Sequence, residues 1–558
     1  MAHRRRRRRL PAHPLALLIA LPVAAALVTM LGALLRPDME VWQFVGGTML
    51  PQVVPTTLVL ALATVLLATT IGVGCAWVTS LYDFPGRRWL TAALILPLAI
   101  PAYLLATVYI GWFDYAGPVA SWLRDWFGPH AQLPPIRSVG GAALVLALAL
   151  YPYVYLLARN AFLSQGRRAL EVAASLGYGP VAGFLRIGLP LARPWIAGGA
   201  LLVMMETLAD FGAVSAFNVR TLTTAIYQSW FALFSIDGAL ALACVLVGIA
   251  LVIATLERRQ RRHQRFVGDA GMQATHRLAL SGWRGWAASA GCGLVVIAGA
   301  IAPLAQLASW AWFHRADIDS RLIGFAGHSL LLAGMAAGLL TFVGLLLAWL
   351  LRQDGRRGTR MLGRLATAGY AIPGTVLAVA LFVPLAGLSE WLSTTLSGWS
   401  SSTIRIALHA GLATLLLGYG ARFLTVATHP IEGQLMRVSP AMEDVARSLG
   451  SSTWDMARRV HAPMIRGGLV TAAILVFVDV MKELPLTLMT RPYGWDTLAV
   501  RVFEMTAEGE WSRAAVPGVA IVLAGLIPVF WLVRGSEPHT RRHGAADNMT
   551  EWTDAHAA

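Results

Sequence analysis

The sequence predicts an all-α polytopic membrane protein in which twelve transmembrane helices form two parallel six-helix repeats. Three features lead to this fold class: long uncharged apolar runs, basic residues that gather on one side of those runs, and an internal repeat. Of the 558 residues, 57% are hydrophobic and only 13% are charged, whereas about a quarter of the residues in a soluble domain are charged. The composition therefore excludes a soluble enzyme, a disordered chain and a small disulfide-stapled secreted domain.

The apolar runs are long enough to cross a bilayer, because about 20 helical residues span a hydrocarbon core of roughly 30 Å. We expect twelve spans, near residues 15–35, 55–80, 90–112, 140–163, 195–217, 238–256, 287–310, 328–351, 365–388, 404–428, 467–490 and 515–533.

The basic residues predict how these spans are oriented, since the cytoplasmic loops of membrane proteins are enriched in Lys and Arg. With the N-terminus placed in the cytoplasm, 34 of the 45 basic residues fall on the inner side and 10 on the outer side, while Lys482 lies within a span. We therefore expect both termini to be cytoplasmic. The run from Arg4 to Arg9 is interpreted as an orientation signal before a retained first span, rather than as part of a cleaved signal peptide or a nucleic-acid or lipid patch.

An internal repeat with an offset of 273 residues divides the chain. The segment from Glu171 to Gly177 matches that from Asp444 to Gly450, and 8 of the 23 residues in 171–193 are identical at this offset. Because six spans per repeat return the chain to the same side, the repeats are parallel. We expect a basic cytoplasmic N-terminus (1–14), a first half (15–256), a basic linker (257–285), a second half (286–534) and a cytoplasmic tail (535–558).

The repeated segments fall in two loops on the cytoplasmic side. Residues 168–176 and 441–449 are predicted to form short helices with acidic starts, as the helix dipole favours. Gly177 and Gly450 permit the turn that ends each helix. Two such loops on one membrane face would offer a twin docking surface to a symmetric cytosolic partner.

The loop pattern, with Glu171, Ala173, Gly177, Leu189 and Pro190, resembles the EAA loop of binding-protein-dependent ABC importer permeases. The resemblance extends to Glu206–Gly212, Lys482–Pro485 and Asp496–Val500, which are similar to the ferric-iron branch with its two fused six-span halves. It implies a type I importer permease that docks a pair of cytosolic ATP-binding subunits, with a homodimer favoured, and receives its substrate from a periplasmic binding protein at a bacterial inner membrane. The residues expected to couple to the ATPase are Glu171, Ala173, Gly177, Pro190, Glu443, Asp444, Ala446, Gly450 and Pro463.

The second loop departs from the family pattern in two ways. Both Glu443 and Asp444 stand near the acid position, which leaves open which carboxylate meets the ATPase, and Ala462 replaces the leucine before Pro463.

The chain lacks the residues that catalysis would need. Lys482 is its only lysine and lies in no glycine-rich loop, so ATP must be hydrolysed by a separate subunit. No nucleophile–base or zinc-protease motif occurs, and Cys75, Cys244 and Cys292 are interpreted as small core residues. We expect no catalytic site, no resident metal, no cofactor and no nucleic-acid partner.

Five charged residues fall inside the predicted spans and are candidates for the translocation path: Glu206, Asp210, Asp479, Lys482 and Glu483. A charge in a bilayer is costly and normally faces a partner, a cavity or a pathway. On continuous helices, Asp210 and Glu483 would share a face with the acids four residues earlier. An acidic lining would suit a hard cation such as ferric iron. Pairing of Lys482 with Asp479, or hydrogen bonding between helices that locks the bundle, would instead make these residues structural.

Two further features leave alternatives open. Pro97, Pro101, Pro373 and Gly374 predict breaks at matching places in the two halves, which fit either a gate or static packing. The outer segments 114–139, 218–237 and 491–514 are rich in aromatic and acidic residues and would form interfacial belts or receive a binding protein.

The expected function is substrate translocation by an ATP-driven importer, with ferric iron as the substrate. One alternative is an ATP-driven importer of the same class whose substrate is thiamine, a polyamine or a phosphonate. Another is an ion-coupled secondary transporter, which would leave the matched loops unexplained.

Overall fold

The computed structural model describes residues 12–261, 277–395, 411–451, 453–456, 458 and 462–536. The arginine run 4–9, most of the linker and the tail 537–558 lie outside these residues. Side chains in 165–174, which include those of Glu171 and Ala173, and the side chain of Glu443 also lie outside the described part.

Helices occupy all twelve predicted spans, which confirms the all-α polytopic fold. In chain order the spans are α1 (Ala12–Leu35), α3 (Leu50–Leu81), α4 with α5 (Arg87–Ala93, Ala102–Phe113), α7 (Val139–Ser175), α9 with α10 (Leu189–Ala209, Gly212–Ala216), α12 (Ile236–Arg261), α13 with α14 (Trp283–Val296, Ala302–Phe313), α15 (Ser320–Gln353), α16 with α17 (Arg357–Thr367, Gly374–Thr395), α19 (Leu412–Leu435), α22 with α23 (Ala462–Met481, Pro485–Thr490) and α25 (Ala515–Ser536). Within the described residues, nine stretches are long and apolar enough to cross a membrane, and the bent pair that contains α4 and α5 brings the number to ten.

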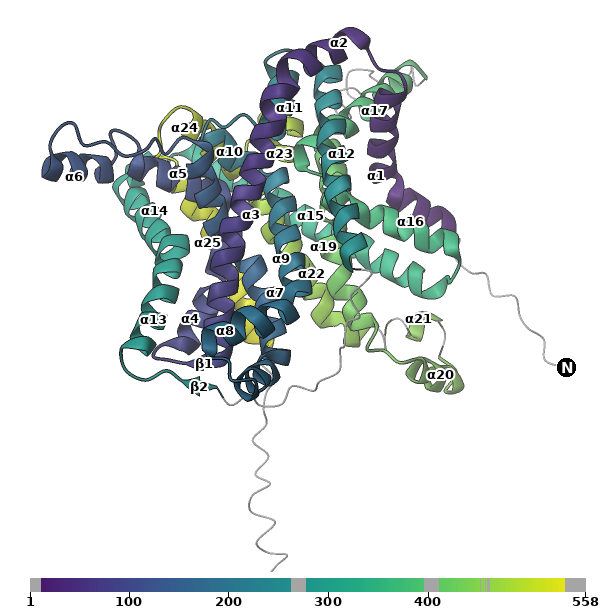
Figure 1. Ribbon diagram of the computed structural model, residues 1–558. Helices are drawn as coiled ribbons and strands as arrows, with labels where there is room; N and C mark the ends of the chain where they lie inside the picture. Colours follow the sequence, from purple (N-terminus) through teal and green to yellow (C-terminus); the bar gives the residue numbers. More distant parts are fainter. Residues whose placement is uncertain are drawn as a thin grey trace, which may run out of the picture.

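Shorter elements connect these spans. They are α2 (Met39–Phe44), α6 (Pro118–Phe127), α8 (Pro180–Gly183), α11 (Leu222–Phe231), α20 (Pro440–Ser448), α21 (Thr453–Met456) and α24 (Leu498–Ala507), with the π-helical turns η1 (Val45–Met49), η3 (Phe184–Gly188) and η4 (Ile297–Ile301) and the 3₁₀ turns η2 (Leu96–Ala99), η5 (Arg315–Asp317) and η6 (Ala368–Ala371). Figure 1 shows α8 and α20 at one end of the bundle, together with the two short strands, and α6 and α24 at the other. We name these the α20 end and the α24 end.

The two repeats have the same internal packing. Helix α3 packs on α7 and α9, and its counterpart α15 packs on α19 and α22. The first span of each repeat crosses over to the other one: α1 packs on α16 and α17, while α13 contacts α4 and α14 contacts α5. Because α1, α13 and α14 pack on helices of the other repeat, each repeat covers part of the other one's helix surface. The division of the chain at 257–285 remains a prediction.

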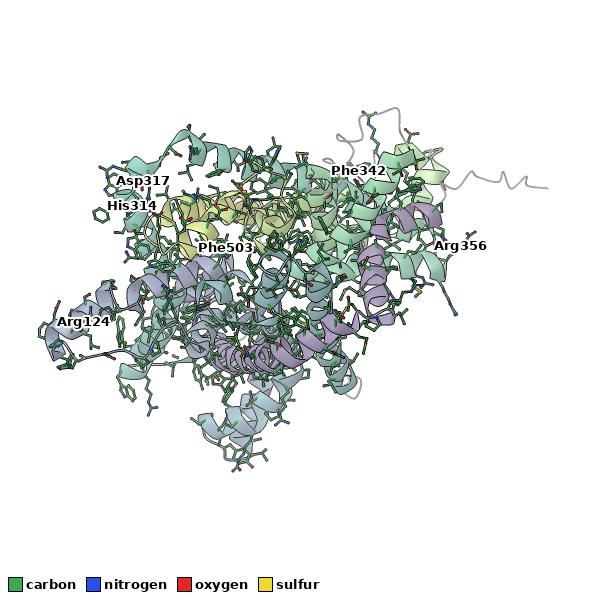
Figure 2. All side chains as sticks on the ribbon, turned by 90° about the horizontal axis from the view of Figure 1, so that it is seen from above. Arg124, His314, Asp317, Phe342, Arg356 and Phe503 are labelled. Atoms are coloured by element: carbon green, nitrogen blue, oxygen red, sulfur yellow. The ribbon has the colours of Figure 1, made fainter. Side chains whose placement is uncertain are left out.

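Small residues allow the helices of the first repeat to approach closely. A Cβ added at Gly72 of α3 would lie 2.9 Å from the carbonyl oxygen of Tyr151, and one at Gly199 of α9 would lie 2.7 Å from the Cα of Val154. Close backbone contact of this kind drives helix association where lipid removes the hydrophobic advantage. Large apolar side chains cover much of the outer surface, as at Phe342, which is 65% exposed (Figure 2).

The third span of each repeat is broken at the predicted place. In the first repeat η2 ends before Pro101, and in the second η6 ends before Pro373. The preceding residues, Ile100 and Ile372, have ψ angles of 120° and 127°, as expected because proline disfavours a helical conformation in the residue before it. The helical segments on the two sides of Pro101 differ in direction by 95°.

A two-residue parallel ladder was not predicted from the sequence. Strand β1 (Tyr82–Asp83) pairs with β2 (Leu278–Ala279), and the backbone N–H of Leu280 donates to the carbonyl of Asp83 at 2.9 Å. The ladder ties the end of the linker to the loop after α3 at the α20 end (Figure 1).

Candidate functional site: two loops and a polar cavity

The first candidate coupling loop follows α7, which continues beyond its apolar run to Ser175. Gly177 has a φ of +74°, the left-handed conformation in which glycine commonly terminates a helix. Pro190 lies in the first turn of α9, and helical structure is continuous through η3 into it. The helical segment after Gly177 therefore continues through Pro190 directly into the fifth span.

The second loop has the same design. Gly450 has a φ of +80°, and the N–H of Ser451 donates to the carbonyl of Ala446 at 3.0 Å, which is the six-to-one bond of a Schellman motif. Ala446 is buried and Asp444 exposed, while Pro463 lies in the first turn of α22. Both loops lie at the α20 end (Figure 1).

Apolar side chains on these loops point away from the bundle. Leu176 and Val181 are 61% and 72% exposed in the first loop, and Val445 and Leu449 are 60% and 81% exposed in the second. Exposed apolar groups of this size are typical of protein interaction sites when they gather at one end of a molecule. The two loops therefore share the exposed apolar groups that a docking surface in two copies would need, and docking there remains a prediction.

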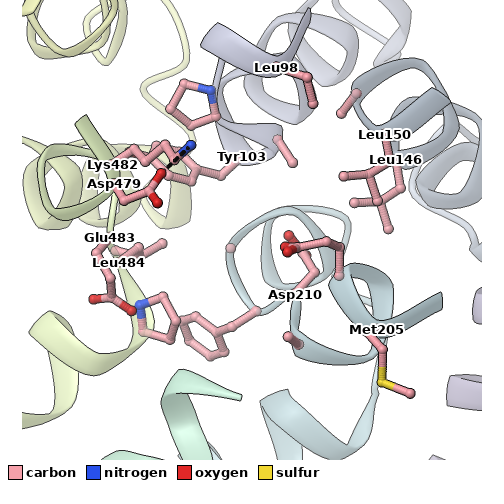
Figure 3. A pocket seen from close by; sticks show the side chains of 18 of the residues that line it. Leu98, Tyr103, Leu146, Leu150, Met205, Asp210, Asp479, Lys482, Glu483 and Leu484 are labelled. Carbon is pink, nitrogen blue, oxygen red and sulfur yellow. Dashed lines mark ion pairs between the residues drawn. The ribbon is translucent and has the colours of Figure 1, made fainter. Parts of the chain in front are cut away.

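A polar cavity lies between the two repeats and has a volume of about 320 Å³. All five residues predicted to line a path contribute to it: Glu206, Asp210, Asp479, Lys482 and Glu483. The broken third spans also reach it, through Pro97 and Pro101 in one repeat and Tyr370 in the other. Figure 3 shows Asp479 and Lys482 opposite Leu146 and Leu150 of α7.

Asp479 and Lys482 form an ion pair within the membrane. Lys482 Nζ lies 2.9 Å from Asp479 Oδ1, and the side chains are 35% and 22% exposed to the cavity. The pairing predicted as one alternative is therefore present, and both members also face the cavity. Glu206 of the first repeat lies within electrostatic range of this pair and of Arg422.

Asp210 and Glu483 have a different position from the one expected. Helices α9 and α22 end at Ala209 and Met481, so neither acid shares a helical face with the acid four residues before it. Asp210 Oδ1 accepts from the N–H of Val214 at 3.0 Å.

Glu483 makes a fuller set of bonds at the equivalent place. Its carboxylate accepts from the N–H groups of Leu486 and Thr487 at 3.1 and 2.9 Å and from the Thr487 hydroxyl at 2.8 Å. Both acids therefore cap the short helix that follows a break, which explains their occurrence at matching positions of the repeat.

Arg422 of α19 lies in the cavity, although it lies near the end of the predicted span 404–428 and is one of the 34 basic residues that the sequence assigned to the inner side. Its Nε and Nη1 atoms are buried and have no hydrogen-bond partner within the described part of the chain. A Cβ added at Gly374 would lie 2.7 Å from Arg422 Nη1 and 3.0 Å from Glu483 Oε1, so Gly374 leaves room for both groups. One signal could have identified it, since Arg422 is the one charge in the apolar run 404–428 apart from Arg405 near its start.

The lining is consequently mixed in charge rather than acidic. Four carboxylates occur in matching pairs on the two repeats, whereas both cations, Arg422 and Lys482, belong to the second. At the 273-residue offset these cations correspond to Ala149 and Ala209. Within the described residues, no three His, Cys, Asp or Glu side chains are grouped closely enough to hold a metal ion, so the acids do not form a ready-made coordination sphere.

The outer segments at the α24 end carry both aromatic residues and ion pairs. Trp122 and Trp126 on the projecting helix α6 are 56% and 73% exposed (Figure 1). Arg491 instead pairs with Asp496 at 2.7 Å and with Glu504 at 3.1 Å, which fixes the loop before α24. Interfacial belts and binding-protein contacts both remain predictions for these segments.

Comparison with known proteins identifies the family. Residues 341–542 match the model of the binding-protein-dependent transport system inner membrane component. The chain is 26% identical over 488 residues to an Fe(3+)-transport system permease protein, FbpB 2, of Haemophilus influenzae, and the match covers 86% of this chain and 89% of the relative. It is 30% identical over 197 residues to a probable molybdenum ABC transporter permease of Haloferax volcanii, covering 35% of this chain and 70% of the relative.

A sulfate transport system permease protein, CysW of Escherichia coli, is 30% identical over 162 residues, or 29% of this chain and 54% of the relative. The recurrence of such permeases agrees with the membrane fold and the twin loops. The chain belongs to the family of binding-protein-dependent transport system inner membrane components, the permease subunits of ABC importers.

Proposed function

We propose that this permease imports ferric iron across the inner membrane, with both termini in the cytoplasm. The observation that carries the choice of substrate is the match to an iron permease along 86% of the chain, through both repeats. The matches to the molybdenum and sulfate permeases extend over about a third of the chain. A periplasmic binding protein would deliver iron at the α24 end.

Coupling to ATP is assigned to the two loops at the α20 end. Each presents a short helix ended by a left-handed glycine and exposed apolar side chains, and two copies suit a homodimer of separate ATP-binding subunits that hydrolyse ATP. Glu171, with Glu443 or Asp444, would provide the acidic contact, Ala173 and Ala446 would lie on the docking helices, and Pro190 and Pro463 would begin the spans that receive the motion. Closure of the subunits would thereby move α9 and α22.

Those two spans carry Glu206 and Asp479, and Lys482 directly follows α22. These three residues and Arg422 of α19 are proposed to contact the substrate or its escorting ligands during passage, while Asp210 and Glu483 hold the breaks in the spans. Oxygen ligands suit a hard trivalent cation, and the two cations keep the lining from binding it too tightly. Weak transient contact agrees with the absence of a metal-holding cluster among the described residues.

The test is uptake of radioactive iron by cells that carry this permease as their single iron importer, together with its ATP-binding and binding proteins. We expect saturable uptake that disappears when ATP is depleted and is unaffected by excess molybdate, sulfate, thiamine, polyamine or phosphonate. If one of those solutes reduced iron uptake, that solute and not iron would be assigned as the substrate. Uptake that survives ATP depletion but stops when the ion gradient is dissipated would indicate a secondary transporter instead.

A further inference from the structure

Four arginines meet at the α20 end of the first repeat, away from the cavity and the coupling loops. Arg87 and Arg88 begin α4, Arg159 lies on α7 and Arg277 directly precedes β2. The β1–β2 ladder brings Arg277, which is distant in sequence, beside Asp83 and the start of α4. We call these four residues the arginine cluster.

The protein supplies little negative charge to this cluster. Asp83 pairs with Arg87 at 2.9 Å. The Nε atoms of Arg159 and Arg277 are buried without a hydrogen-bond partner within the described part of the chain. Burial lowers the pKa of Arg277, and the charges of Arg87, Arg159 and Arg88 lower it further against the opposing effect of Asp83. Gathering cations in this way is unfavourable unless an anion joins them.

In the second repeat the arginines of the corresponding region have different partners and neighbours. There the Arg352 guanidinium donates to the carbonyls of Leu435 and Val438 at 2.5 and 2.7 Å. The residue that corresponds to Arg159 at the 273-residue offset is Glu432. The gathering of arginines at this place is thus not a requirement of the fold, because the corresponding region of the second repeat differs.

The surroundings place the arginine cluster at the level of lipid headgroups. Helix α13 packs on α4, and the two helices carry Trp89, Trp283 and Trp286, which are 84%, 77% and 68% exposed. Exposed tryptophans at the end of a span are typical of the membrane–water interface. In Figure 1, α4, α13 and the two strands lie together at the edge of the bundle, where lipid can reach them.

We propose that the arginine cluster is a binding site for the phosphate group of an anionic phospholipid. Basic pockets between transmembrane helices bind such headgroups, and guanidinium groups form paired hydrogen bonds to phosphate oxygens. The bound lipid would join α4, α7 and the end of the linker, and so would stabilise the connection between the two repeats.

The test measures the melting temperature of the purified full-length permease in a neutral detergent, with and without added phosphatidylglycerol. We expect the lipid to raise the melting temperature of the wild-type protein. In the double variant Arg159→Gln, Arg277→Gln, the apparent affinity for the lipid should fall about thirtyfold, because each arginine at an anionic surface contributes roughly fivefold. Without lipid the double variant should melt no lower than the wild type, because repulsion in the cluster is reduced.

Controls separate this site from general surface charge. Arg357→Gln removes an exposed arginine of α16 and should leave the lipid effect unchanged. Phosphatidylethanolamine and inorganic phosphate serve as the zwitterionic and soluble probes, and neither should reproduce the shift. An equal shift with inorganic phosphate, an equal affinity in the double variant, or an equal loss in Arg357→Gln would overturn the proposal, and none of these results bears on the transported substrate.

Discussion

At the scale of single residues, the charges in the cavity divide into two kinds. Asp210 and Glu483 are committed to backbone N–H groups of the helices after them, whereas Glu206 and the Asp479–Lys482 pair face open space between the repeats. In both repeats the capping acid follows the cavity-facing acid by four residues, so the sequence spacing alone could not tell which acid caps a helix and which faces the cavity. The two roles follow from the position at which each helix breaks.

Glu206→Gln should therefore strongly reduce transport without harming the fold. The change keeps the volume of the side chain and removes its charge from the cavity, so we expect uptake to fall by an order of magnitude or more. Yield, melting temperature and association with the ATPase should be those of the wild type. Unaltered iron uptake by this variant would remove Glu206 from the path.

Asp479→Asn should affect stability as well, because it leaves Lys482 without its partner. Breaking a fully buried pair costs about 3–5 kcal/mol, and partial exposure to the cavity makes a smaller loss the expected result here. The melting temperature should fall, and the added change Lys482→Met should restore it. If that rescue restored uptake together with stability, the pair would be structural alone.

Glu483→Ala tests the capping role. It removes the acceptor of three hydrogen bonds at the start of α23, and leaving buried N–H groups unsatisfied costs about 1–3 kcal/mol. We expect a clear drop in melting temperature, measured in detergent, and a smaller drop for Asp210→Ala, whose carboxylate accepts from the backbone N–H of Val214. A melting temperature equal to that of the wild type in both variants would contradict the capping assignment.

At the scale of elements, the sequence predicted helices better than it predicted their interruptions. The twelve spans and the glycine-terminated loop helices follow from apolar runs and repeated glycines, both of which are local properties. Tertiary contacts determine the helix breaks after Ala209 and Met481 and the β1–β2 ladder. The pattern of apolar residues therefore does not predict them. Arg422 was assigned to the inner side because it lies near the end of an apolar run, and the run did not reveal that α19 extends to Leu435.

The two loop helices should fail when their terminal glycines are replaced. A β-branched residue in the left-handed conformation is strained by roughly 1–2 kcal/mol, so Gly177→Val with Gly450→Val should distort both docking helices. We expect loss of co-purification with the ATP-binding subunit and loss of uptake. Gly179→Ala is the matched control, because Gly179 has no positive φ and open space around it. Normal association of the double variant would refute docking at these glycines.

An ion pair at the α24 end should make stability depend on pH. Arg513 lies 2.8 Å from Asp317 and holds the pKa of that carboxyl below its ordinary value of about 3.9. His314, which lies beside Asp317 in Figure 2, lowers this pKa further. A lowered pKa stabilises the folded state above the unfolded-state value, and this contribution is lost as pH falls through the folded-state pKa. Arg513→Gln should melt lower than the wild type at neutral pH, and the difference should shrink in acid. A difference that stays constant with pH would show that Asp317 is not the partner concerned.

At the scale of the whole molecule, the internal repeat explains which features occur twice and which occur in one half alone. Helix packing, capping acids and coupling loops occur twice, which suits a symmetric pair of ATP-binding subunits. The cavity and the arginine cluster are asymmetric. The second repeat alone supplies Arg422 and Lys482 to the cavity, and the buried Nε atoms of Arg159 in the first repeat and Arg277 in the linker have no hydrogen-bond partner among the described residues. A fused chain permits such divergence, since each half can change without its copy.

The central claim is that ATP hydrolysis by subunits docked on these loops drives iron through this cavity. It is tested most directly with the permease and its ATP-binding subunits in proteoliposomes, by measuring ATP hydrolysis and iron transport when the binding protein is added with and without ferric iron. The account predicts that the iron-loaded binding protein stimulates hydrolysis and that transport requires ATP. Equal stimulation by the iron-free protein with no iron transported, or iron transport without ATP, would contradict it.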